Sequence, residues 1–190
     1  MRDRRLALAC AAVLALLGAA ACRDQSSLSG CPGTESSAAP VDESLLAFLS
    51  AARSLHHEAD VKVQGDDRAG AVAALRRLVE MPAPHAVEAD EVLADARARL
   101  AELELEAGDL ERADRDVQAG LQRVAGTTYF RGHLLEVQGL VAEARAASLA
   151  DAGRADEAAK ARTQAVTLLE EAVQVQEKVI EHALSDGGRE

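Results

Sequence analysis

The sequence predicts an all-α fold, and three observations lead to that prediction. Apolar residues recur at steps of three and four from Asp42 onward, which places them on one side of α-helices. Residues that favour strands are scarce, since aromatic side chains make up 2% of the 190 residues. Gly65, Gly108 and Gly153 interrupt the helical pattern at spacings of 43 and 45 residues, so each unit holds two long helices.

Residues 1–21 are typical of a secretory leader, with three arginines, an apolar run over residues 6–17 and small residues at the end. The apolar run is too short to predict a membrane span. Cys22 follows at once, and the segment resembles a bacterial lipoprotein signal, in which that cysteine is lipidated and becomes the mature amino terminus. The resemblance implies a lipid anchor at Cys22. An ordinary cleaved leader with an incidental Cys22 is the alternative.

The resemblance also implies a location in the cell envelope. Arg23 follows Cys22, where an Asp would signal retention in the inner membrane, so the outer membrane facing the periplasm is favoured over the inner membrane. Residues 22–40 are rich in Ser, Gly and Pro and lack an apolar period, which predicts a flexible tether. Cys31 in this tether either pairs with another chain or remains an exposed free thiol.

Six helices are expected between residues 41 and 184, and turn residues or prolines separate them. Asp42 caps the first helix, which runs to Gln64. The second helix stops before Pro82. The remaining helices are expected over residues 87–107, 110–124, 130–152 and from about 155 to 184, with a disordered tail at 185–190.

The stretch over residues 99–124 predicts two helices folded back on each other. Gly108 can take the left-handed conformation that ends a helix, and Asp109 can cap the next one. Ala113 is the small residue, five places after Gly108, at which the helices cross. The same pattern recurs in AGRADEA (152–158) and more weakly in QGDDRAG (64–70).

These turns resemble those of tetratricopeptide repeats. The resemblance implies antiparallel helical hairpins stacked as a short α-solenoid of about three long hairpins, each longer than the family's unit of about 34 residues. It also implies a partner groove lined by residues of the first helix of each hairpin: Leu55, Asp95, Glu102, Glu106, Leu140 and Glu143. A generic Ala-rich helical bundle is the alternative.

A net charge of −11 argues against nucleic-acid binding, which needs a basic surface. Charge complementarity predicts that a partner in the groove is another protein, basic or mixed apolar and basic. Alternatively, the acidic groove residues only reflect the overall charge.

Residues suited to catalysis or metal binding do not form a recognised pattern. His56, His57 and Asp60 are close in sequence, but a metal site needs three or four ligands, so none is predicted. Glu102, Glu104 and Glu106 are expected on exposed helix surfaces, where a carboxyl pKa is not raised. No phosphate-binding loop and no hydrolase or metalloprotease motif occurs.

The sequence therefore predicts a lipid-anchored envelope protein that acts as an interaction or assembly scaffold, with no enzymatic activity and no cofactor. A structural or self-associating helical bundle without a specific groove is the second hypothesis. A metal-binding protein is the third.

Overall fold

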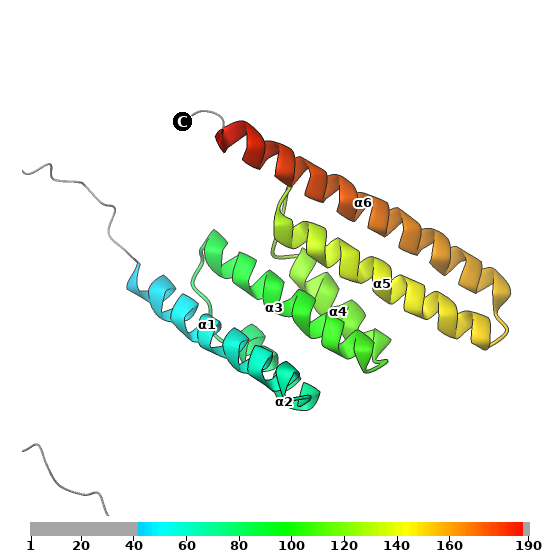
Figure 1. The fold of residues 1–190 in the computed structure, drawn as a ribbon, viewed down its shortest axis with the longest axis horizontal. Coiled ribbons are helices and arrows are strands. Elements are labelled where there is room, and N and C mark those ends of the chain that lie inside the picture. Colours follow the sequence, from blue (N-terminus) through cyan, green and yellow to red (C-terminus); the bar gives the residue numbers. More distant parts are fainter. Residues whose placement is uncertain (1–41, 188–190) are drawn as a thin grey trace, which may run out of the picture. The chain divides into compact units, whose positions relative to one another are not determined.

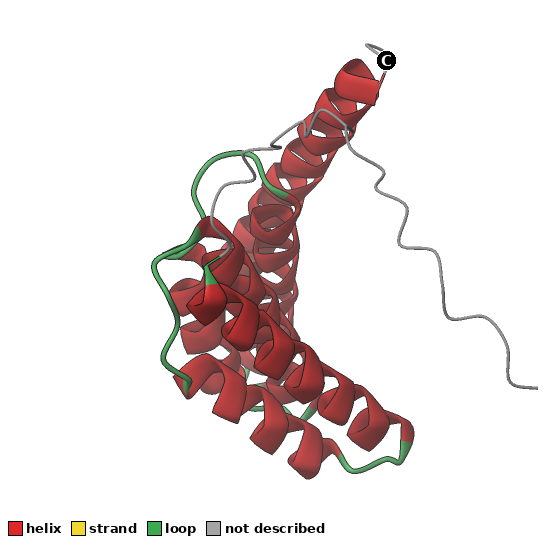
Figure 2. Cartoon of the chain, turned by 90° about the vertical axis from the view of Figure 1, so that its left-hand side faces the viewer, coloured by secondary structure: helices red, strands yellow, loops and turns green. Residues whose placement is uncertain are grey.

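The computed structural model describes residues 42–187, which form six α-helices and no strand. The helices are α1 (Glu43–Gln64), α2 (Arg68–Glu80), α3 (Val87–Glu106), α4 (Leu110–Leu121), α5 (Tyr129–Asp151) and α6 (Ala155–Gly187) (Figures 1 and 2). The all-α prediction is confirmed over this range. The predicted leader, Cys22, the tether and Cys31 lie outside the described residues.

Local capping explains where most of the helices begin. The Asp42 carboxylate accepts hydrogen bonds from the backbone amides of Ser44 and Leu45 at the start of α1. The residues that precede α2, α4 and α5 each accept a hydrogen bond from the backbone amide three positions later. These caps are Asp67, Asp109 and Thr128. Such caps satisfy backbone donors that lack a partner within the helix.

The turns differ in which residue takes the left-handed conformation. Gly108 (φ 78°) and Gly153 (φ 74°) take it between α3 and α4 and between α5 and α6. Gly65 ends α1 with φ −85°, and the following Asp66 (φ 58°) takes the left-handed conformation instead. Aspartate tolerates this conformation better than most residues, so the first turn needs no glycine for it.

Each helix packs against the next one across a short turn, so that α1 contacts α2, α3 contacts α4 and α5 contacts α6. Successive pairs touch through two further kinds of contact. The second helix of one pair packs on the first helix of the next, as in α2 on α3 and α4 on α5. First helices also touch each other, as in α1 on α3 and α3 on α5 (Figure 1).

Two apolar clusters lie between these helices, and α3 contributes to both. Leu93 and Leu100 belong to the first cluster, which α1 and α2 complete. Ala94, Ala98 and Ala101 belong to the second, which residues of α4 and α5 complete. Helix α3 is therefore buried on two sides, and its alanines allow the neighbouring helices to approach closely.

Two helix ends differ from the predicted boundaries. Helix α4 ends at Leu121 rather than near Val124, because the chain turns at Gly126 (φ 76°) and Val124, 5% exposed, packs into the second cluster. Helix α6 continues to Gly187, past the predicted boundary at residue 184. No proline or internal glycine interrupts α6 before its last residue, so nothing in this segment ends the helix earlier.

Candidate functional site

The six residues predicted to line a groove lie on α1, α3 and α5, the first helices of the three pairs. Leu55 on α1 is half-buried and packs against the first apolar cluster. Leu140 and Glu143 on α5 are exposed. The other three residues, all on α3, are acids that contact basic side chains of neighbouring helices.

Asp95 belongs to a polar cluster between α1 and α3. Its carboxylate lies 3.7 Å from Nε2 of His56, and Arg99 donates a hydrogen bond to His56 Nδ1 at 2.7 Å. Since a guanidinium only donates, Nδ1 accepts and the His56 proton lies on Nε2, toward Asp95. Arg99 also pairs with Asp60 on α1. Burial lowers the pKa of His56, and the charges of Asp95 and Asp60 oppose this effect while Arg99 adds to it.

Glu102 and Glu106 are also paired within the chain. Glu102 Oε1 lies 2.9 Å from Nε2 of His133 on α5, and this hydrogen bond raises the pKa of His133. Glu106 accepts a hydrogen bond from Arg68 of α2 at 3.0 Å. Each contact joins helices of different pairs, so these acids tie successive pairs together.

The α3 acids of the predicted groove are therefore not isolated charges. The three α3 acids contact His56, Arg68 and His133, and an incoming basic partner would compete with these contacts. A hollow of about 290 Å³ nevertheless lies between α1, α3 and α5. Its lining residues are Leu49, Ala52, Arg53, His56, Val92, Asp95 and Phe130.

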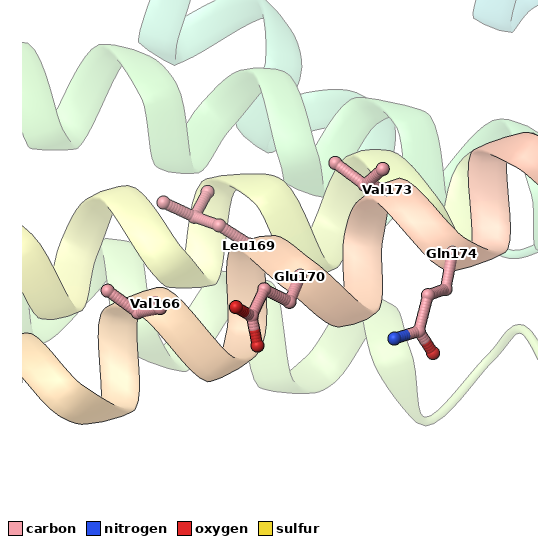
Figure 3. Close-up of a pocket in the computed structure, with 5 residues that line it drawn as sticks. All are labelled: Val166, Leu169, Glu170, Val173 and Gln174. Atoms are coloured by element: carbon pink, nitrogen blue, oxygen red, sulfur yellow. The ribbon is translucent and has the colours of Figure 1, made fainter.

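A second open surface lies along α6 and had no counterpart among the predicted site residues. Five residues of α6 line a shallow hollow of about 420 Å³: Val166, Leu169, Glu170, Val173 and Gln174 (Figure 3). A neighbouring hollow of about 240 Å³ extends this surface to Glu143 of α5, and its other lining residues are Arg162, Ala165, Val166 and Leu169. This groove between α5 and α6, together with the apolar side of α6, is called the α5–α6 groove below.

The prediction that Glu104 is exposed is wrong. Its side chain is buried, with Oε1 paired to Arg76 of α2 and Oε2 without a hydrogen-bond donor among the described residues. The carboxyl group faces that of Asp116 on α4, which Arg97 contacts at 2.6 Å. Burial, followed by the Asp116 charge, raises the pKa of Glu104 to about 7 from 4.5. A proton shared by the two carboxyl groups is the physical reason that they can lie together.

No step along α3 distinguishes Glu104 from its neighbours in the sequence. Glu102 follows the fully buried Ala98 by four residues, as Glu104 follows the fully buried Leu100. The burial of Glu104 depends on the contacts of α3 with its neighbouring helices, which the sequence does not show.

Within residues 42–187, no group of three or more His, Cys, Asp or Glu side chains is placed to hold a metal ion. His56 and Asp60 instead both contact Arg99. None of the helices in this range is long and apolar enough to cross a membrane. The chain matches no protein-family model, no curated protein and no solved structure.

Proposed function

We propose that this chain is a lipid-anchored envelope protein whose helical domain is a docking scaffold for a basic or mixed apolar and basic protein. In this proposal the three helix pairs are hairpins stacked as a short solenoid that resembles tetratricopeptide repeats. The proposal assigns the chain no catalytic role. Glu104, whose pKa is raised, is buried against Arg76 and Asp116. The lipid on Cys22 holds the domain at the membrane, facing the periplasm.

The observation that carries the docking role is the repeated packing of the helix pairs. Both α2 on α3 and α4 on α5 use the second helix of one pair to cover the first helix of the next. Arrays of this kind present extended surfaces rather than enclosed pockets, and such surfaces bind other proteins. Leu140 and Glu143 are exposed on the third pair and keep the mixed apolar and acidic character expected of a surface for a basic partner.

The anchor is tested by replacing Cys22 with Ser. A chain that cannot be acylated is expected to move from the membrane fraction to the soluble fraction, because stable anchoring requires acyl chains. Cys31→Ser is the matched control and should remain with the membrane. Sedimentation of Cys22→Ser with the membranes at the wild-type level would contradict the anchor.

The docking role is tested by crosslinking in the native envelope, followed by mass spectrometry. One stoichiometric basic partner, lost at high salt, is the expected result, since salt screens charges at a surface. Crosslinks only between copies of this chain would instead favour the self-associating bundle.

A further inference from the structure

The three helix pairs place apolar residues at equivalent positions. When the chain is aligned at Gly65, Gly108 and Gly153, the residues 13 places later are Leu78, Leu121 and Val166. The residues 16 places later are Met81, Val124 and Leu169. All six are apolar. Each lies within the second helix of its pair, except Met81 and Val124, which follow α2 and α4 by one and three residues.

In the first two pairs these positions are covered by the following helix. Leu78 is fully buried in the first apolar cluster, to which α3 contributes, and Met81 packs against that cluster. Val124 is 5% exposed in the second cluster, to which α5 contributes, and Leu121 packs against it. The repeated positions therefore belong to the apolar clusters that the first helix of the next pair helps to form.

In the third pair no following helix is present among the described residues, and the same surface is open. Val166 is 55% exposed, and Leu169 next to it lines the hollow of Figure 3. The apolar row continues along α6 through Val173, Ile180 and Leu184, at helical steps of seven and four. From Val166 to Leu184 it is about 27 Å long, because an α-helix rises 1.5 Å per residue.

The far end of this row extends past α5. Gly132, near the start of α5, lies beside Gln176 and Ala172 of α6, and only three residues of α5 precede it. Ile180 and Leu184 are therefore in a part of α6 that α5 does not cover (Figure 1). Both side chains are more than half exposed, at 58% and 73%. An exposed apolar row of this kind is typical of an interaction site.

Acidic side chains border the apolar row. Glu170, Glu177 and Glu181 lie along one side of it, at 100° per residue, and Glu143 of α5 lines the other side of the groove. Over residues 42–187 none of these four carboxylates has an ion-pair partner, in contrast to the three α3 acids. Arg162 lines the start of the groove.

We propose that the α5–α6 groove binds one amphipathic helix of another protein, whose apolar stripe is flanked by Lys or Arg. The helix occupies the place that the first helix of a next pair would take. This inference rests on the proposed docking role and assigns the surface and the chemistry of the partner. A second copy of this chain that docks by the same surface is a poorer fit, because it would bring Glu170, Glu177 and Glu181 of the two copies together.

The test uses the full-length chain in detergent and two synthetic helical peptides of about 18 residues, enough to cover the apolar row. The peptides share one apolar stripe and carry either Lys or Glu beside it. Fluorescence anisotropy is expected to give at least about tenfold tighter binding of the Lys peptide at low salt, with a smaller difference at about 1 M salt. Absence of binding by the Lys peptide, or equal binding of both peptides, would overturn the proposal.

Two variants locate the binding surface. Val173→Glu should weaken binding of the Lys peptide about tenfold or more, because it places a charge in the apolar contact. Val61→Glu on α1 is the matched control, since both valines are 52% exposed, and should leave binding unchanged. Circular dichroism checks that both variants remain helical. Equal loss in the two variants would show that the peptide does not bind at the groove.

A charge-reversed chain, Glu170→Lys with Glu177→Lys, gives a second measurement that does not depend on Val173. It should shift the preference from the Lys peptide toward the Glu peptide, and an unchanged preference would contradict the inference. Self-association that Val173→Glu abolishes, measured by analytical ultracentrifugation, would identify a second copy as the occupant instead.

The same variants separate this inference from the docking role as a whole. If the envelope partner still crosslinks to Val173→Glu at the wild-type level, the docking role stands and the α5–α6 groove is the wrong surface. If no partner crosslinks to the wild type and neither peptide binds, both proposals fail.

Discussion

Replacing Glu104 by Gln removes the need for a proton between two buried carboxyl groups. The glutamine oxygen can still accept the hydrogen bond from Arg76, and its amide can donate toward Asp116 in place of the shared proton. Arg97 continues to neutralise Asp116, so the substitution leaves the remaining charges of the cluster in place. The variant therefore mimics the protonated state of Glu104 at every pH.

The size of the effect follows from the raised pKa. Between pH 4.5 and about 7, folded Glu104 keeps a proton that the unfolded chain has already lost, so the free energy of unfolding falls as pH rises through that window. The full difference is at most roughly 3.5 kcal/mol, because the shift is about 2.5 pKa units and one unit corresponds to about 1.4 kcal/mol. Above the window, Glu104→Gln should thus be more stable than the wild type by about 1–3 kcal/mol.

Urea unfolding followed by circular dichroism measures this difference at about pH 5 and about pH 8. Near pH 5 the two chains should have similar stability, since folded Glu104 is then protonated. Glu143→Gln is the control, because it removes the same charge from an exposed position and should alter the comparison by less than about 0.5 kcal/mol. The reasoning fails if Glu104→Gln changes stability equally at both pH values, or is less stable than the wild type at the higher one.

Two further predictions concern α3, α4 and α5. Glu102→Gln should lower the pKa of His133 in an NMR titration, and it should remove stability that is present below pH 6.5 and lost as pH rises through the raised pKa. An unchanged His133 titration would refute the pairing. Gly120→Ala should destabilise the fold by about 1–3 kcal/mol, because its Cβ would lie 2.7 Å from the fully buried Leu134. At Gly132 the nearest atom to an added Cβ is Cγ of the flexible Gln176 at 3.1 Å, and the next is Val175 Cγ1 at 3.4 Å. Gly132→Ala should therefore change stability by less than about 1 kcal/mol, and the opposite order in urea unfolding would contradict the packing.

The helices could be predicted from the sequence because their signals are local. Apolar steps of three and four, capping by Asp42 and Asp109, and the stop before Pro82 each depend on residues within one or two turns. The turn at Gly65 shows how limited such signals are. The sequence indicates a turn there, but whether Gly65 or Asp66 takes the left-handed conformation depends on the geometry of both helices.

The polar contacts could not be predicted in the same way, because their partners are distant in sequence. Glu104 pairs with Arg76, 28 residues earlier, and His133 with Glu102, 31 residues earlier. The number of acidic residues along a helix therefore predicts the sign of the surface charge. It does not predict which carboxylates already contact a basic side chain of the same chain. Register alone predicts that Leu55 faces the groove, whereas its packing against the first cluster depends on how closely α1 and α3 approach.

The distribution of ion pairs bears on how a partner helix would be recognised. Contacts between alanine-rich helices resemble one another along the chain, so they specify weakly how one helix is aligned against the next. Ion pairs between successive pairs of helices specify this alignment further. Arg68 with Glu106 joins the first pair to the second, and Arg145 with Asp114 joins the second to the third. At the α5–α6 groove the corresponding apolar positions are present, but the bordering carboxylates have no ion-pair partner among the described residues. If the groove binds a helix as the internal interfaces do, the partner must supply those cations, and its register would be set by where they lie.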